Sequence, residues 1–366
     1  MLKGVFTLDY NSIIPHFSID GEVLITEPHG EGHIHDTYLI TTAEARYVFQ
    51  RINHHVFKSP ENIMENITAI TSYLRKKIIE RGGDPTRETL NLIPTKDGKS
   101  FYKSEDGNYY RMYAFIYGAQ SHQTVKEPIH FYNAARAFGL FQKQLADFPA
   151  NTLFESIVNF HNTRVRFENF ISAVEEDKMN RAKDVTAEIE FAKARGGEAG
   201  TVIDLIEAGE IPLRVTHNDT KYDNIMIDDK TGEGICVIDL DTVMPGSLLY
   251  DYGDSLRFGT NPAAEDEKDL SKVYMSEELF EMFTKGFLEE MRDSLTPAEI
   301  HILPFSAKLM TYECGIRFLT DYLDGDNYFK TEYPGQNLDR ARTQFKLVAD
   351  MENKMDFMAK TVKKYL

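Results

Sequence analysis

The chain has 366 residues, of which 42% are hydrophobic, so it is long enough to bury one large core or two moderate ones. Its formal net charge of -17 disfavours nucleic acid or an anionic membrane surface as the main partner, because both need clustered Lys and Arg. With two cysteines, no apolar leader at the N-terminus and no run of about eighteen apolar residues, the sequence predicts a cytoplasmic protein without a disulfide framework or a membrane span.

The first part of the chain alternates short apolar runs with turns, a pattern typical of a small, mostly β domain. Strands are expected at residues 23–27 and 37–41, and the connection between them contains Gly30 and Gly32. Because glycine lets the backbone come close to an anion, this connection is a candidate phosphate-covering loop. An ordinary hairpin turn explains the two glycines equally well.

A charged pair for nucleotide binding is predicted in the next two elements. Arg51 lies in the strand expected at 47–53 and is a candidate for the cation that contacts the nucleotide phosphates. A Ser-Pro pair opens a helix that is expected to run from residue 60 to about residue 81. Glu65, near the start of this helix, is the predicted partner of Arg51, and Glu61 is the alternative. A solvated helix face explains both glutamates as well.

A second strand pair is expected at 99–102 and 109–116. The segment 113–118, which contains Phe115, is predicted to be a hinge whose backbone contacts adenine. After this segment the apolar residues recur every three or four positions, which predicts helices. The expected helices cover residues 130–145, 154–170, 177–195, 201–207, 277–295, 298–323 and 337–366.

The most informative motif is H-x-D-x4-N at residues 217–224, which has the spacing of the kinase catalytic loop. Phosphoryl transfer by kinases needs a carboxylate that accepts the proton of the attacking hydroxyl, and an Asn and an Asp that hold Mg2+ at the phosphates of ATP. Short strands are expected on either side of the turn 229–233, so the hairpin brings Asp239 back beside Asn224. The sequence therefore predicts Asp219 as the base and Asn224 and Asp239 as the Mg2+ ligands.

Three other interpretations of this motif are less favourable than a small-molecule kinase. An isolated H-x-D-x4-N also occurs as a polar loop, but the apolar strand that ends in Ile238-Asp239 at the correct distance favours a kinase. A catalytically silent sensor or scaffold of the same fold has no chemical need for all three metal and base residues. A protein kinase is disfavoured because the D-F-G and A-P-E segments are absent. Lys221 is predicted to reach the transferring phosphoryl group, with an exposed lysine as the alternative, and the role of Asp241 stays open.

Five longer stretches resemble the N-acetylhexosamine 1-kinases, within the aminoglycoside phosphotransferase-like group of small-molecule kinases. They are residues 30–38, 211–221, 237–246, 251–259 and 313–319, and the resemblance extends over nearly the whole chain. It implies a bilobal, protein-kinase-like α+β fold, with a small β-rich, nucleotide-binding N-lobe (1–117) and a larger, mainly helical C-lobe (118–366). The sequence departs from the family pattern at His35, where Asn is expected, and at Arg51, which replaces a Lys by a planar fork of donors.

The resemblance also implies a sugar site between the lobes, with His33, Arg317 and Tyr328 in contact with the sugar and Asp219 facing its reactive hydroxyl. Each of the three contacts has another explanation. His33 could be a turn residue, Tyr328 could pack in the core, and Arg317 could pair with the acidic residues one helical turn away on either side. Phe258 is a candidate platform for the apolar face of a pyranose ring.

The expected reaction is the transfer of the γ-phosphoryl group of ATP to the anomeric hydroxyl of N-acetylglucosamine or N-acetylgalactosamine, with Mg2+ as cofactor. The expected partners are ATP and a small amino sugar, and nothing in the sequence indicates an obligate protein partner. A kinase for another small alcohol, such as a different hexose, an aminoglycoside or choline, is the nearest alternative.

Overall fold

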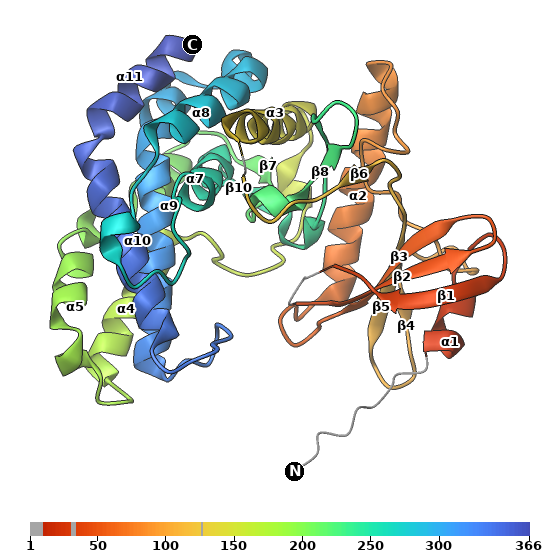
Figure 1. The fold of residues 1–366 in the computed structure, drawn as a ribbon, viewed down its shortest axis with the longest axis horizontal. Coiled ribbons are helices and arrows are strands. Elements are labelled where there is room, and N and C mark those ends of the chain that lie inside the picture. The colour runs from red at the N-terminus through yellow and green to blue at the C-terminus, as the bar shows by residue number, and fades with distance from the viewer. Residues whose placement is uncertain (1–9, 31–33, 126) are drawn as a thin grey trace. The chain divides into compact units, whose positions relative to one another are not determined.

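The computed structural model describes residues 10–30, 34–125 and 127–366. The chain divides into two compact units, Met1–Gly118 and Ala119–Leu366, which are drawn together in Figure 1 and are described separately below. The first unit is built on an antiparallel sheet and the second is mainly helical. The predicted α+β class is confirmed.

The sheet of the N-terminal unit has five antiparallel strands in the order β1-β2-β3-β5-β4. The strands are β1 (Val23–Pro28), β2 (Asp36–Thr42), β3 (Arg46–Ile52), β4 (Tyr102–Lys103) and β5 (Tyr109–Ala114). All but β4 agree with the predicted positions apart from small shifts at their ends, whereas β4 shares only Tyr102 with the strand expected at 99–102. Phe49 and Tyr110 stack with ring centroids 5.6 Å apart and are fully buried. Two short helical turns, α1 (Tyr10–Ile13) and η1 (Ile14–His16), place Ile14 and Phe17 against the same core.

Helix α2 (Pro60–Glu80) begins with a proline in its first turn, as the sequence predicts. Its buried apolar residues recur at helical spacing and include Ile63, Ile67, Ile70, Leu74 and Ile78. These residues lie on one face of the helix, and burial of that face orients α2. Glu61 and Glu65 lie on the exposed side.

The C-terminal unit is organised around the long helix α9 (Pro297–Asp324), which contacts α4 (Thr163–Glu176), α7 (Leu248–Gly259) and α10 (Gln336–Asn353) (Figure 1). The other helices are α3 (Pro128–Gln144), α5 (Thr186–Lys193), α6 (Thr201–Glu207), α8 (Glu277–Met291) and α11 (Met355–Tyr365). Thr296 and Glu299 form a capping box at the start of α9. Glu299 also accepts two bonds from the Arg214 guanidinium, at 2.7 and 2.8 Å, which ties α9 to β7 (Arg214–Thr216).

Three predicted helices in this unit differ from the structure, and one of them, expected over 337–366, is divided at Lys354 into α10 and α11. The helix expected over 154–170 begins only at Thr163, because the Asn162 side chain caps it by accepting the N–H of Val165 at 3.2 Å. The helix expected over 177–195 shrinks to α5, because Asp177 adopts the left-handed conformation (φ 38°) and ends α4.

Helix α7 was not predicted. Its residues from Leu248 to Arg257 are all buried, and they include the charged residues Asp251, Asp254 and Arg257, types that usually lie on the exposed face of a helix. The side chain of Ser247 caps the helix by accepting the N–H of Leu249 at 3.3 Å. Helix α7 packs on α9 and bonds directly to the predicted catalytic loop.

Short strands surround that loop. The predicted hairpin is confirmed as β8 (Ile225–Asp228) and β9 (Gly234–Val237), with β6 (Ala119–Gln120) added beside β8. A second antiparallel pair, β7 with β10 (Met244–Gly246), was not predicted. None of the helices in the described residues combines the length and the apolarity that a membrane span needs.

The close contact between α7 and α9 gives a stability prediction. A Cβ atom on Gly253 would lie 2.5 Å from the backbone oxygen of Ser306 and 2.6 Å from Cγ of Met310. Gly253→Ala should therefore lower the free energy of unfolding by about 1–3 kcal/mol, the usual cost of overpacking, measured by urea denaturation followed by circular dichroism. Gly197→Ala is the matched control, because a Cβ there meets nothing within 4 Å. Equal stability of wild type and Gly253→Ala would contradict this packing.

Candidate active site

The predicted catalytic loop runs from the end of β7 to the start of β8. Thr216 closes β7 and donates its hydroxyl to the carbonyl of Met244 on β10, at 3.1 Å. Asn218 and, after the hairpin, Asp239 have positive φ angles of 65° and 59°. Left-handed conformations at residues other than glycine cost about 1–3 kcal/mol, so both must be held by the surrounding structure.

Asp251, in the first turn of α7, bonds to three residues of the loop. Its carboxylate accepts the backbone N–H of His217 at 2.9 Å and of Asn218 at 2.7 Å. Its backbone carbonyl accepts the hydroxyl of Thr220 at 2.7 Å, and Gln142 of α3 also donates to the carboxylate. Helix α7 thus sets the conformation of the residues that precede Asp219.

Three predicted site residues meet in the loop. Lys221 places Nζ 2.9 Å from Oδ1 of Asp219. Asn224 donates its amide N–H2 to the backbone oxygen of Asp219 at 2.8 Å and lies 3.3 Å from Oδ2. The negative charge of Asp219 raises the pKa of Lys221 above its usual value, more than burial lowers it. The ammonium group therefore stays charged beside the carboxylate.

The hairpin brings Asp239 back to the end of the strand pair at which Asn224 lies. Ile225 pairs with Val237, and the N–H of Ile238 donates to the backbone oxygen of Asn224 at 2.9 Å. An amide oxygen and a carboxylate are ligand types that suit Mg2+, and the bonds of Asn224 to Asp219 use its nitrogen. The two residues that the sequence proposes as ligands are thus chemically suited to Mg2+.

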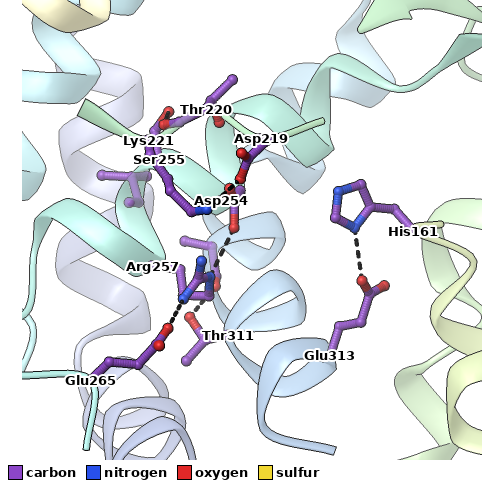
Figure 2. Close-up of polar contacts among 12 residues, drawn as sticks. His161, Asp219, Thr220, Lys221, Asp254, Ser255, Arg257, Glu265, Thr311 and Glu313 are labelled. Atoms are coloured by element: carbon purple, nitrogen blue, oxygen red, sulfur yellow. Dashed lines mark hydrogen bonds and ion pairs between the residues drawn. The ribbon is translucent and has the colours of Figure 1, made fainter. Parts of the chain in front are cut away.

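Buried charges that the sequence analysis did not single out lie below the loop (Figure 2). Arg257 donates through Nε to Asp254 at 2.8 Å and lies 3.3 Å from Glu265. Burial alone would raise the pKa of Asp254, but the charge of Arg257 and of other cations lowers it below its usual value. Ser255 donates its hydroxyl to the carbonyl of Thr220 at 3.0 Å. The second half of α7 therefore also supports the loop.

A further buried pair joins the loop to α9 (Figure 2). Nε2 of His161 lies 2.9 Å from the backbone oxygen of Asn218, and Nδ1 lies 2.8 Å from Oε1 of Glu313. Thr163 donates its hydroxyl to the other oxygen of Glu313, and the guanidinium of Arg317 lies 4.0 Å from Oε1. The loop is thereby connected through two side chains to a predicted sugar-binding residue.

Arg317 and Tyr328 line the same cavity, which has a volume of about 360 Å³. The cavity lies at α4, α9 and the segment that follows α9, and its other lining residues include Arg166, Asn169, Thr320 and Phe329. Tyr328 is 62% exposed, so it is not a core residue. Asp321 does not pair with Arg317 in the described structure; it accepts the backbone N–H groups of residues 327–329 at 2.8–2.9 Å and shapes the cavity.

Of the other substrate-binding candidates that the structure describes, neither Asp219 nor Phe258 lines this cavity. Phe258 lies half-buried near the end of α7 and does not line it. His33 and the nucleotide-loop residue Gly32 lie outside the described residues. Gly30 has φ of 76°, the conformation for which glycine is favoured.

The predicted partner of Arg51 is wrong. Asp36 on the neighbouring strand β2 stands opposite Arg51 and accepts its Nε–H at 2.7 Å. Glu61 instead accepts the Tyr109 hydroxyl at 2.6 Å, and Glu65 is exposed. The register of β2 and β3 thus supplies Arg51 with its carboxylate partner.

Phe115 lies directly after β5, where the hinge is predicted. Its backbone N–H donates to the carbonyl of Arg46 at 3.1 Å, and the Arg46 guanidinium lies 5.8 Å from its ring centroid. The ring is half-buried and has Tyr117 at 5.1 Å. The adenine-binding role of this segment stays a prediction.

Comparison with known proteins identifies the class. The chain belongs to the phosphotransferase enzyme family, whose model matches residues 25–274. A solved aminoglycoside phosphotransferase from Alicyclobacillus acidocaldarius is 13% identical with a TM-score of 0.59, and the match covers 94% of this chain and 93% of that one. Spectinomycin phosphotransferase in complex with ADP and spectinomycin is 14% identical with a TM-score of 0.56 (94% and 97% covered).

The choline kinase from Cryptosporidium parvum is 13% identical with a TM-score of 0.55, and the match covers 93% of this chain and 92% of that chain. At such low identity these likenesses concern the fold alone. They confirm the kinase-like fold that the sequence predicts, and the family match makes the chain a phosphotransferase.

The bonds of Asp251 give a prediction for the loop. An asparagine there has one acceptor oxygen, so Asp251→Asn leaves one of two buried N–H groups unsatisfied. The free energy of unfolding should fall by at least about 1–3 kcal/mol, measured by urea denaturation. Hydrogen exchange at the amides of His217 and Asn218 should become faster. Asp229→Asn, in an exposed turn, is the control, and unchanged exchange in Asp251→Asn would disprove the anchoring role.

Proposed function

We propose that this phosphotransferase moves the γ-phosphoryl group of ATP to the anomeric hydroxyl of an N-acetylhexosamine. The observation that supports the chemistry best is the cluster of Asp219, Lys221 and Asn224, with Asp239 returned beside it by the hairpin. A carboxylate, a cation and two oxygen ligands at this spacing are the groups that transfer of a phosphoryl group from ATP requires.

In this proposal Asp219 orients the attacking hydroxyl and accepts its proton. Lys221 lies 2.9 Å from the same carboxylate and neutralises charge on the transferred group. Mg2+ held by Asn224 and Asp239 would neutralise the phosphates of ATP. Because the transition state is loose, the residues act mainly by positioning the reactants and by balancing charge.

The nucleotide residues belong to the N-terminal unit. Arg51 is proposed to contact phosphate, and it is about one-third exposed while paired with Asp36. The conformation of Gly30 and the position of Phe115 after β5 are compatible with roles in covering phosphate and flanking adenine. Binding of ADP by the related-fold spectinomycin phosphotransferase supports a nucleotide role for this class of fold.

The sugar is proposed to use Arg317 and Tyr328. Their shared cavity of about 360 Å³ falls in the size range of small-molecule sites. A guanidinium can donate to a carbonyl or hydroxyl oxygen of an N-acetyl sugar, and the Tyr328 ring offers an apolar face. The lining carries three basic side chains, Arg166, Lys178 and Arg317, and three acidic ones, Glu176, Asp321 and Asp324, a balance of charge that suits a neutral sugar.

Asp219→Asn tests the base. The variant should keep its fold and its affinity for ATP, while kcat falls by at least about a hundredfold, the scale of a lost general base. Turnover is measured with a coupled ADP assay, and ATP affinity by calorimetry. A correctly folded variant with wild-type kcat would exclude Asp219 as the base.

Substrate analogues test the position that is phosphorylated. A screen of free sugars and small alcohols with ATP and Mg2+ should select N-acetylhexosamines, and NMR should find the phosphate on C1. The 1-deoxy analogue of N-acetylglucosamine should bind without reacting, whereas the 6-deoxy analogue should react. Removal of the N-acetyl group should lower kcat/KM, because polar groups of the site lose their partners. A 6-phosphate product would overturn the anomeric assignment, and turnover of another alcohol alone would overturn the sugar assignment.

A further inference from the structure

The peptide unit that leads into Asp219 is bonded to an imidazole at each end. Its carbonyl oxygen, on Asn218, lies 2.9 Å from Nε2 of His161. Its N–H group, on Asp219, donates to Nδ1 of His217 at 3.3 Å. The side chains of His161 and His217 therefore hold one peptide plane, which begins at the left-handed residue Asn218.

The partners of His217 define its protonation. Nδ1 receives the N–H of Asp219, so this nitrogen carries no proton. Nε2 lies 2.9 Å from the carbonyl oxygen of Ile238, which only accepts, so Nε2 carries the proton. His217 is thus a neutral imidazole with its proton on Nε2.

The partners of His161 define a different state. The carbonyl oxygen of Asn218 only accepts, so Nε2 of His161 carries a proton. Nδ1 faces a carboxylate oxygen of Glu313, whose other oxygen already accepts the hydroxyl of Thr163. With the Arg317 guanidinium 4.0 Å away, Glu313 stays ionised, and Nδ1 must then donate as well. His161 is thus an imidazolium.

The charged groups around His161 agree with this state. Burial by itself lowers the pKa of His161, but Glu313 and Asp254 raise it above its usual value. Burial raises the pKa of Glu313, but His161 and Arg317 lower it below its usual value. The charged or titratable groups that face the His161–Glu313 pair are Arg317 on α9, Arg166 on α4, and Asp254 and Tyr250 on α7.

We propose that His161 and His217 are positioning residues that hold the Asn218–Asp219 peptide in opposite charge states, His161 as an imidazolium and His217 as a neutral imidazole. The role in catalysis rests on the proposed function, because it requires Asp219 to be the base. The charge states themselves do not. Loss of the positive charge leaves Glu313 buried with one fewer cation and weakens the bond from Nε2 to the Asn218 carbonyl, so the carboxylate of Asp219 is held less firmly in its orientation.

The charge states are tested on the wild-type protein. Two-dimensional 1H–15N spectra of the histidine side chains at pH 7 should show His161 with both nitrogens protonated and His217 with a proton on Nε2 alone. The signals are assigned with single His→Gln variants. A singly protonated His161, or a doubly protonated His217, would overturn the proposal whatever substrate the enzyme uses. This measurement needs no enzyme activity. A wrong sugar assignment can therefore be distinguished from wrong charge states of His161 and His217.

The positioning role is tested by His161→Gln, which keeps one donor and removes the charge. kcat should fall more than tenfold, measured with the best alcohol found in the screen, while the KM for ATP changes less than about twofold. His161→Gln/Glu313→Gln, which also removes the buried carboxylate, should regain part of the loss in stability. His301→Gln, at an exposed position of α9, is the control. A folded His161→Gln with wild-type kcat would disprove the role.

The pH dependence of stability gives a readout of the charge. Since the folded-state pKa of His161 is raised, its stabilisation is complete below the usual histidine range and is lost as the pH rises through the raised value. The difference in urea midpoint between wild type and His161→Gln should therefore shrink as the pH rises above the usual histidine range. A difference that is independent of pH would contradict the imidazolium.

Discussion

One buried carboxylate, that of Asp251, determines the shape of the catalytic loop. It accepts the N–H groups of two successive residues, His217 and Asn218, so the turn before Asp219 is bonded to helix α7 and not only to its own strand. These bonds offset the cost of the left-handed conformation at Asn218. Because α7 packs closely on α9 through Gly253, the position of Asp219 depends on a contact between two core helices.

The same region holds several charges away from water, and each has a partner. A buried ion without a partner costs several kcal/mol, so Glu313 with His161 and Asp254 with Arg257 are stable only together. Pairs of this kind add little net stability compared with apolar residues. We interpret them as devices that fix one conformation of the loop, which makes the site sensitive to single substitutions at residues that do not contact a substrate.

The parts of the site that could be predicted are those that are close in sequence. The spacing in residues 217–224 and the hairpin after it depend on local turn chemistry. His161 could not be found in this way, because its partners Asn218 and Glu313 lie 57 and 152 residues away. Helix α7 was missed because its charged residues Asp251, Asp254 and Arg257 are buried, whereas a short segment that contains such residues is typical of an exposed loop. The partner of Arg51 was wrong because strand register, which pairs it with Asp36, outweighed the helix that follows.

Helix α9 carries both residues that support the loop and residues that line the cavity. Glu299 ties it to β7 and Glu313 ties it to the loop, while Arg317 and Thr320 line the cavity. One turn of helix, about 5–6 Å, separates Glu313, which supports the loop, from Arg317, which lines the cavity. Divergence of substrate range within such a scaffold can therefore proceed through side chains on a single helical face. The transfer machinery would be inherited unchanged, because the backbone that carries both does not have to move.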